Sequence, residues 1–180
     1  FSVSANGVLY DTEKNGLIPS ILDKWFDERV EFKNLMKKYA KAGDEQKRLY
    51  YHQRQYTTKI LLNSLYGVLG SPSFRFFDID NAEAVTTTGQ QVIKNTAKIV
   101  NHYYARELGK EDEYCIYTDT DSTFVLAEPM LSKRYPDIDF NDGKLIAEKT
   151  MELATEVQAH INKTYDLYAK KFHFVNSHRF

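Results

Sequence analysis

A short polar junction between two long periodic segments constrains this fold most. Apolar side chains recur at close to helical spacing after Pro19, a favoured first-turn residue, and Gly43 is expected to end that helix. Asp44 is a good N-cap for a second helix, which should run to about Leu69, where a Gly-Ser-Pro-Ser run follows. Because only residues 42–44 join the two segments, the sequence predicts a long antiparallel helical hairpin.

The rest of the chain completes an α+β fold, in which an antiparallel β-sheet packs on helices. Residues 1–18 predict a short strand and turn, and residues 113–117 and 123–127 predict a β-hairpin around 118–122. Other elements are expected in this order: a helix over about 81–108, a loop with a short turn over 129–143, a helix over 144–170 and a strand from 172–175. Residues 86–89 are weak helix formers, so close packing or a kink is expected there.

Composition limits the class of protein. The chain has 180 residues, 42% hydrophobic and 27% charged, which suits one globular domain with a core. Cys115 is the only cysteine, so an intrachain disulfide is impossible and a reducing compartment is expected. No apolar run approaches a membrane span, so no membrane partner is expected. The start, Phe1-Ser2-Val3-Ser4, is interpreted as sequence from the middle of a longer protein.

Charge is unevenly distributed along the chain. Residues 14–75 hold 12 Lys and Arg against 6 Asp and Glu, whereas residues 76–180 hold 12 against 17. A basic part followed by an acidic part suits a grip on a polyanion next to a cation site. The alternative is chance patterning on solvated helix faces.

The second predicted helix carries a polar stripe. Gln55, Lys59, Asn63 and Tyr66 are spaced i, i+4, i+8 and i+11, which places them on one face. Gly67 weakens the helix next to Tyr66, and it would let another backbone or a base pair approach closely. The alternative is that a second helix packs against Gly67.

Two basic residues of the first helix should lie near this stripe. Arg29 is fourteen residues before Gly43 and Lys59 sixteen after it, so they lie about 21 Å and about 24 Å from the hairpin tip at about 1.5 Å per residue. Arg29, Lys33, Lys59 and Asn63 should then lie at similar heights, which predicts a phosphate cradle. Alternatively, Arg29 and Lys33 solubilise an exposed face and Lys59 pairs with a carboxylate.

A pair of aspartates predicts a metal site. Asp119 and Asp121 alternate with threonines, so in extended geometry both carboxylates face one side. Mg²⁺ prefers oxygen ligands and relieves their repulsion, and two such ions serve phosphoryl transfer. The alternative is a turn stabilised by Asx hydrogen bonds. Two-metal chemistry needs a further carboxylate: Asp78 and Asp80 are candidates by position, although Asp80 better suits the N-cap of the helix over 81–108.

The two motifs together resemble those of a known family. Residues 59–67 read Lys-Ile-Leu-Leu-Asn-Ser-Leu-Tyr-Gly and residues 117–122 read Tyr-Thr-Asp-Thr-Asp-Ser. They are similar to the fingers and palm motifs of family B DNA polymerases, in particular the replicative enzymes of tailed bacteriophages. The resemblance implies a lead-in strand and turn over 1–18, a fingers hairpin over 19–70 and a partial palm over 71–180.

The resemblance also implies a nucleotide site on the hairpin. Arg29, Lys33 and Lys59 would bind the triphosphate of an incoming dNTP, with Asn63 beside it. Tyr66 would pack against the nascent base pair.

In the palm, the resemblance implies a metal site. Asp121 would be the main Mg²⁺ ligand, and Asp119 a second ligand near the primer end. Ser122 and Gly67 would lie close to primer-template DNA. Lys59, Asp119 and Asp121 would be the catalytic side chains, and the two-metal site would be completed by a carboxylate outside this chain.

The family pattern has parts that this sequence lacks: the first metal-binding aspartate motif, the exonuclease and thumb regions and the Lys-Lys-x-Tyr motif. The isolated chain is therefore expected to be inactive and to need those segments as partners. A sliding clamp is a further candidate partner of the full enzyme, and the cytoplasm of an infected bacterial host is the expected location. Two alternatives stay open: a non-catalytic fragment or split-polymerase subunit, and a metal-dependent phosphohydrolase or nuclease using Asp119 and Asp121.

Overall fold

The computed structural model describes residues 1–171 and divides into two compact units. The first consists of Phe1 and Tyr10–Glu83, and the second of Ser2–Leu9 and the chain from Ala84 onward. We call the second the α3–α5 unit and describe each unit by itself. The strand expected at 172–175 lies outside the described residues. Among residues 1–171, every helix is too short or too polar to span a bilayer.

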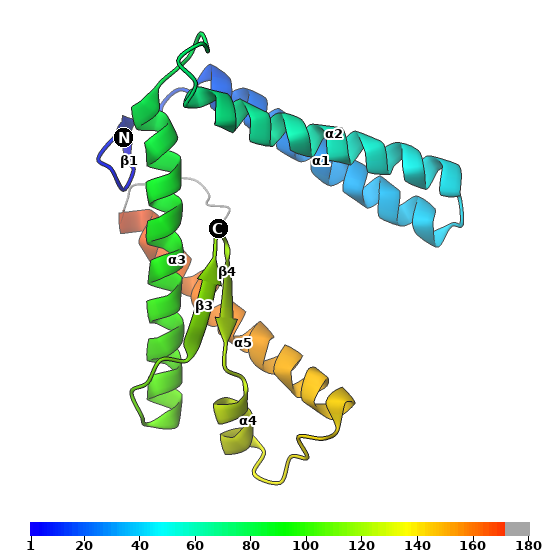
Figure 1. Ribbon diagram of the computed structural model, residues 1–180, viewed down its shortest axis with the longest axis vertical. Helices are drawn as coiled ribbons and strands as arrows, with labels where there is room; N and C mark the ends of the chain where they lie inside the picture. Colours follow the sequence, from blue (N-terminus) through cyan, green and yellow to red (C-terminus); the bar gives the residue numbers. More distant parts are fainter. Residues whose placement is uncertain (172–180) are drawn as a thin grey trace. The chain divides into compact units, whose positions relative to one another are not determined.

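The first unit is built on the predicted helical hairpin, formed by α1 (Leu17–Lys41) and α2 (Glu45–Leu69), which run side by side (Figure 1). Local capping explains the sharp reversal between them. Gly43 adopts φ 73°, which favours glycine, and the Asp44 carboxylate accepts a hydrogen bond of 3.0 Å from the Lys47 amide. The predicted hairpin is confirmed.

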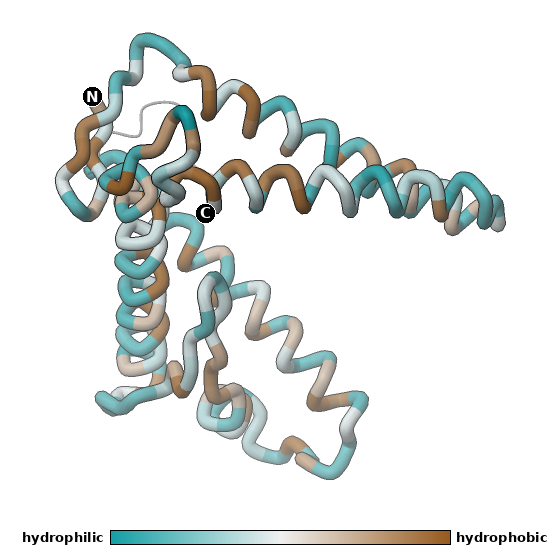
Figure 2. The backbone as a smooth tube through the Cα atoms, turned by 45° about the horizontal axis from the view of Figure 1, so that its top comes forward, coloured by the Kyte–Doolittle hydropathy of each residue, from teal (hydrophilic) through white to brown (hydrophobic). Residues whose placement is uncertain are grey.

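A coiled-coil-like seam holds the hairpin together. The buried and partly buried residues that line it alternate three and four positions apart, which keeps one stripe of each helix facing the other. In α1 they are Leu22, Trp25, Arg29, Phe32, Met36 and Tyr39; in α2 they are Arg48, Tyr51, Gln55, Thr58, Leu62, Leu65 and Leu69. Figure 2 shows the hydrophobic stretches of α2 concentrated at the end away from the tip.

The long helix α3 (Ile79–Leu108) begins at a different cap from the one expected. The Asp78 carboxylate accepts from the Asn81 amide at 3.1 Å and from the Asn81 side chain at 2.7 Å, whereas Asp80 lies within the first helical turn. Asp80 as N-cap was therefore wrong. The helix continues through residues 86–89. Nothing lies within 4 Å of where a Cβ on Gly89 would be, but the Ala5 amide donates a hydrogen bond of 3.1 Å to the Thr88 hydroxyl, so the N-terminal segment packs against this stretch.

The α3–α5 unit encloses a true hydrophobic core. Its buried residues come from α3, from Tyr114, from α4 (Glu128–Arg134) and from α5 (Gly143–Lys171). They are Val100, Tyr103, Tyr104, Tyr114, Met130, Leu131, Leu153 and Val157. Helix α4 differs from the loop predicted from Pro129 onward, because Pro129 occupies the first helical turn, where proline is tolerated. Met130 and Leu131 are each only 1% exposed and anchor this helix in the core.

Two small two-stranded sheets complete the α+β fold. Ser2–Val3 (β1) pairs with Leu9–Tyr10 (β2), and Cys115–Asp119 (β3) pairs with Ser122–Val125 (β4). The β3–β4 pair is antiparallel, as predicted, and Val125 packs on the core. The Asn101 side-chain oxygen, on α3, accepts hydrogen bonds from the Tyr114 and Cys115 amides at 3.0 and 2.8 Å. These bonds fix the start of β3 against α3.

Candidate functional site

Arg29, predicted to bind phosphate, lies in the hairpin seam. Its side chain is partly buried, and its Nε is the one buried side-chain nitrogen or oxygen in residues 1–171 without a hydrogen-bond partner. An unsatisfied buried donor destabilises a protein, more so when it is charged. The position therefore leaves a cationic donor without a partner inside the hairpin.

Ring contacts fix the register of the two helices. Tyr51 lies 6.2 Å from Phe32 and 5.5 Å from Tyr39, measured between ring centroids, and the Arg54 guanidinium lies 5.0 Å from the centre of the Phe32 ring. At about 1.5 Å per residue, this register places Arg29 within about one helical turn of the height of Lys59. The sequence estimate for these two residues agrees with that register.

Lys33 and Lys59 are exposed on the same flank of the seam. Each directly follows a seam residue, Phe32 or Thr58, and in an antiparallel pair those positions project to the same side. On the register above, Lys33 lies about 8 Å nearer the tip than Lys59. Among the described residues, Arg29, Lys33 and Lys59 form no ion pair with a carboxylate. The alternative that Lys59 is neutralised by a carboxylate was therefore wrong.

The same flank of α2 continues through Asn63, Tyr66 and Gly67. Asn63 and Gly67 are exposed, and Tyr66 is 36% exposed, with its hydroxyl 3.5 Å from the Ala82 carbonyl oxygen. Nothing lies within 4 Å of where a Cβ on Gly67 would be. The alternative that another helix packs against Gly67 is wrong for the described chain, and this face of α2 stays open.

The aspartate pair lies at the tip of the β3–β4 hairpin. Asp119 ends β3 opposite Ser122, the first residue of β4, and Thr120 and Asp121 form the turn between them. The Ser122 hydroxyl donates to the Asp119 carbonyl oxygen at 3.1 Å. Asp121 therefore lies in the turn predicted around residues 118–122, and of the two aspartates only Asp119 lies in the extended strand. Both carboxylates remain exposed and two residues apart.

The turn between the aspartates is strained. Thr120 has φ 52°, the one positive φ at a non-glycine residue in the described chain, and β-branched side chains rarely adopt it. The Thr120 hydroxyl donates to Asp119 Oδ1 at 3.0 Å. This hydrogen bond ties the Asp119 carboxylate to the turn. A strained residue at an exposed turn is a common mark of a functional position.

The chemistry of the turn suits a hard cation in part. Two adjacent exposed carboxylates offer oxygen ligands, which Mg²⁺ prefers. Within residues 1–171, however, no group of three or more His, Cys, Asp and Glu side chains is placed to hold a metal ion. Asp78 uses both carboxylate oxygens to cap α3, and Asp80 lies within that helix. Among the described residues, this turn therefore offers two carboxylates, fewer than the oxygen ligands that Mg²⁺ takes.

Three features of these sites were not recognised from the sequence. They are the seam position of Arg29, the strain at Thr120 and the anchoring of β3 by Asn101. The seam position could have been read from the three-four spacing that Arg29 shares with Trp25 and Phe32. The other two depend on tertiary contacts and backbone angles that carry no local sequence signal.

Comparison with known proteins gives one consistent family. A protein-family model described as DNA polymerase family B matches residues 1–171. The DNA-directed DNA polymerase of Escherichia phage RB69 is 30% identical over 182 aligned positions, which cover 74% of this chain and 20% of the phage protein. That of Enterobacteria phage T4 is 29% identical with the same coverage. A DNA polymerase of Paramecium bursaria Chlorella virus NY2A is 30% identical over 162 positions, 90% of this chain and 16% of the viral protein.

Proposed function

Because the chain belongs to DNA polymerase family B, we propose that it is the segment of a template-directed DNA polymerase that binds the incoming dNTP and Mg²⁺. In this proposal α1 and α2 are the fingers, and the α3–α5 unit is part of the palm. The chain spans 20% of the length of the two phage polymerases. Together with further segments, it would transfer deoxynucleotides to a primer 3′-hydroxyl during DNA replication, in an infected bacterial cell.

One observation carries the nucleotide half of the proposal: three basic side chains on one hairpin are not neutralised by any carboxylate of the described chain. Arg29, Lys33 and Lys59 would bind the triphosphate, Arg29 through its planar fork and the lysines as point charges. Asn63 would donate a side-chain hydrogen bond beside them. The partnerless Nε of Arg29 supports this role, because a bound phosphate would supply the acceptor that the seam does not.

The exposed face around Tyr66 and Gly67 supports a role next to DNA. The open space above Gly67 would let a base pair approach the α2 backbone, and the Tyr66 ring would pack against it. Ser122, at the start of β4, would lie near the primer end.

Asp121 and Asp119 would hold Mg²⁺ with a further carboxylate supplied from outside this chain. When bound, Mg²⁺ would make the primer hydroxyl a better nucleophile and neutralise charge on the leaving pyrophosphate. The Thr120 hydroxyl donates to the Asp119 carboxylate, the Ser122 hydroxyl donates to the Asp119 backbone carbonyl oxygen and so stabilises the turn, and the tight turn keeps Asp121 next to Asp119.

Steady-state primer extension tests this proposal in the longer polymerase that carries this segment. Asp121→Ala should abolish incorporation while binding of primer-template stays largely intact. Lys59→Ala should instead raise the KM for dNTP by about tenfold or more, as expected when one charged contact to a phosphate is lost. Lys37→Ala, another exposed hairpin lysine, is the matched control and should change neither. Near-normal polymerisation by Asp121→Ala would disprove the metal assignment.

A second candidate, a split-polymerase subunit that acts only by assembly, follows from the small share of the phage enzymes that the chain covers. Mixing the purified chain with separately produced flanking segments tests it. Synthesis that appears only on mixing supports a split enzyme, whereas turnover by the chain alone contradicts the expectation that it is inactive. The hydrolase alternative gives no reason for the Lys59 motif of α2, and it predicts hydrolysis without template.

A further inference from the structure

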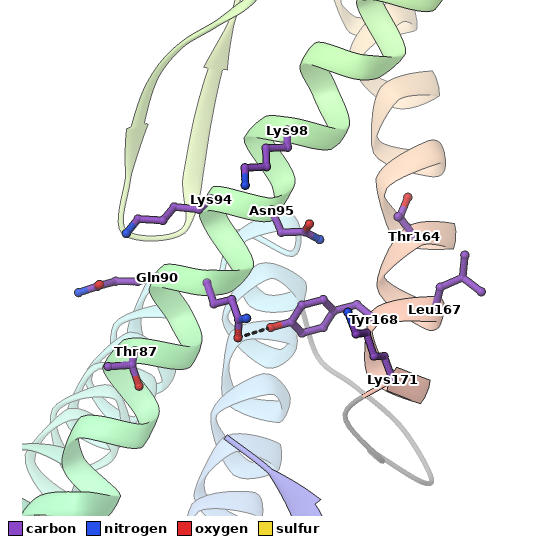
Figure 3. A pocket seen from close by; sticks show the side chains of 10 residues that line it. Thr87, Gln90, Lys94, Asn95, Lys98, Thr164, Leu167, Tyr168 and Lys171 are labelled. Atoms are coloured by element: carbon purple, nitrogen blue, oxygen red, sulfur yellow. Dashed lines mark hydrogen bonds between the residues drawn. The ribbon is translucent and has the colours of Figure 1, made fainter. Parts of the chain in front are cut away.

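A basic groove lies within the α3–α5 unit, between α3 and α5 (Figure 3). Its volume is about 560 Å³, within the size range of ligand sites in proteins. The charged lining residues are Lys94 and Lys98 of α3 and Lys171 of α5, and no carboxylate of residues 1–171 lines it. None of its lining residues has a role in the nucleotide and metal sites proposed above.

The two α3 lysines belong to one face of that helix. Gln90, Lys94 and Lys98 follow one another at intervals of four, and Figure 3 shows Lys94 and Lys98 leaving α3 one turn apart. Like charges at this spacing destabilise a helix. Neither lysine forms an ion pair with a carboxylate in the described part of the chain, so helix stability does not explain the pair.

The groove also contains neutral hydrogen-bond donors. Tyr168 reaches from α5 towards α3, where its hydroxyl donates to Gln91 Oε1 at 3.1 Å (Figure 3). Because the Gln91 oxygen accepts this bond, the NH₂ group of the same amide remains as a donor. Burial raises the pKa of Tyr168 above its usual value, which already keeps the phenol protonated at neutral pH. Asn95, partly buried, adds a second amide to the lining.

Ammonium and amide donors without a lining carboxylate form the chemical environment that binds phosphate oxygens. We propose that the groove between α3 and α5 binds ligands through their phosphate groups. Two sources supply such groups, free pyrophosphate and the phosphodiesters of a single-stranded nucleic acid. The site goes beyond the proposed function, and it does not depend on the assignments of Lys59 or Asp121.

Nuclear magnetic resonance on the ¹⁵N-labelled 180-residue chain locates the site. The chain is titrated with inorganic pyrophosphate and, separately, with a twelve-nucleotide oligothymidylate. The side-chain NH₂ signals of Gln91 and Asn95 are expected to shift and saturate. Shifts with pyrophosphate assign a free-phosphate ligand, and shifts with the oligonucleotide alone assign a strand.

A matched pair of double variants tests the lysines. Lys94→Gln combined with Lys98→Gln is compared with Lys163→Gln combined with Lys170→Gln, which removes the same charge from exposed positions of α5 outside the groove. The groove variant should bind the labelled oligonucleotide about tenfold more weakly at low salt, and the slope of log Kd against log salt should fall by about 1.4 for two lost phosphate contacts. Lys94→Arg combined with Lys98→Arg should bind as the unchanged chain does. Circular dichroism checks that each variant keeps its helices.

Three results would overturn the proposal: unmoved Gln91 and Asn95 amides, equal losses in the two glutamine variants, or equal binding of poly-glutamate at the same amides. The last would show that the groove attracts any polyanion. Asp121→Ala in this chain should leave the groove titration unchanged. A failure of the polymerase proposal, read by incorporation, is therefore separable from a failure here, read by binding.

Discussion

The helical hairpin and the α3–α5 unit are stabilised in different ways. No residue of α1 is fully buried, and α2 buries only Thr58 and Leu69, whereas the α3–α5 unit encloses a cluster of eight buried residues. Apolar burial is the main favourable term in folding, so the hairpin should have the lower local stability. The phosphate-binding cations proposed here lie on that hairpin, in keeping with the rule that moving, ligand-binding elements come from the less stable parts of a fold.

Leucine-to-alanine changes in the core and in the hairpin seam should show the largest difference in stability between the two regions. Leu131→Ala removes a side chain that is 1% exposed from the core, and it should lower the free energy of unfolding by about 3 kcal/mol. Leu62→Ala removes a partly buried seam side chain, and it should lower the free energy of unfolding by about 1 kcal/mol. Urea unfolding followed by circular dichroism measures both. Equal losses would show that the seam is packed as tightly as the core.

Arg29 sharpens the comparison, because the hairpin contains the one orphaned buried donor of the described chain. Arg29→Leu places an apolar side chain next to the seam residues Trp25 and Phe32 and removes the unsatisfied donor, and it should stabilise the hairpin by about 1–2 kcal/mol. The same change should weaken binding of dNTP in the longer polymerase. Thermal unfolding and nucleotide titration measure the two effects.

Lys33→Leu is the control for Arg29, since Lys33 is exposed beside the seam. It should weaken nucleotide binding without stabilising the hairpin. If Arg29→Leu destabilised the chain, the guanidinium would be an ordinary structural residue, and its lone Nε would not mark a ligand site.

These regions also differ in how far the sequence predicts them. Hairpin ends follow from local chemistry: Gly43 and Asp44 encode the reversal by backbone angle and cap. Helix α4 depends instead on Met130 and Leu131 reaching a core built by distant segments, so its own residues read as a loop. Pro129 is ambiguous in the sequence, because proline interrupts a helix when it is internal but is favoured in the first helical turn.

The candidate sites show the same division between local and tertiary information. Lys59 and Asp121 are recognised as candidate site residues from the spacing of their motifs. The helical spacing of residues 59–67 places Gly67 next to Tyr66 on α2. Which carboxylate caps α3 does not follow from the sequence, because Asp78 and Asp80 are two residues apart and both suit a cap. The turn position of Asp121 follows from the β-rich segments on either side of residues 118–122, whereas the exact pairing of Asp119 with Ser122 is visible only in the structure.

The strained turn tests whether the α3–α5 unit gives up stability at its proposed metal site. Thr120→Gly removes the penalty of a positive φ at a β-branched residue, and it should stabilise the chain by about 1 kcal/mol. Thr118→Gly is the matched control within β3, where glycine has no such advantage, and it should destabilise by about 1 kcal/mol. Thermal unfolding compares them. Equal destabilisation by both would mean that the turn stores no strain.

The smallest effect expected comes from an ion pair on the surface of the α3–α5 unit. The Arg134 guanidinium donates to both Glu156 oxygens, at 2.6 and 2.8 Å, and the Tyr103 hydroxyl also donates to Glu156. The hydrogen bonds from Arg134, and to a smaller extent from Tyr103, lower the pKa of Glu156 to about 2. A carboxylate with a lowered folded pKa stabilises the protein above its unfolded pKa of 4.5, and that stability is lost as the pH falls towards 2.

Solvent limits the size of this contribution, because the Glu156 side chain is 49% exposed. The free energy lost between pH 4.5 and pH 2 should be about 1 kcal/mol or less, well below what the pKa alone would give. Glu156→Gln should flatten this part of the stability curve, measured by urea unfolding at a series of pH values, while Glu148→Gln, whose carboxylate lies 3.7 Å from Lys149, should leave it unchanged. A steep loss that persists in Glu156→Gln would assign the acid sensitivity to other carboxylates, and the hairpin, which has its own Asp44 and Glu45 ion pairs, would be the first place to look.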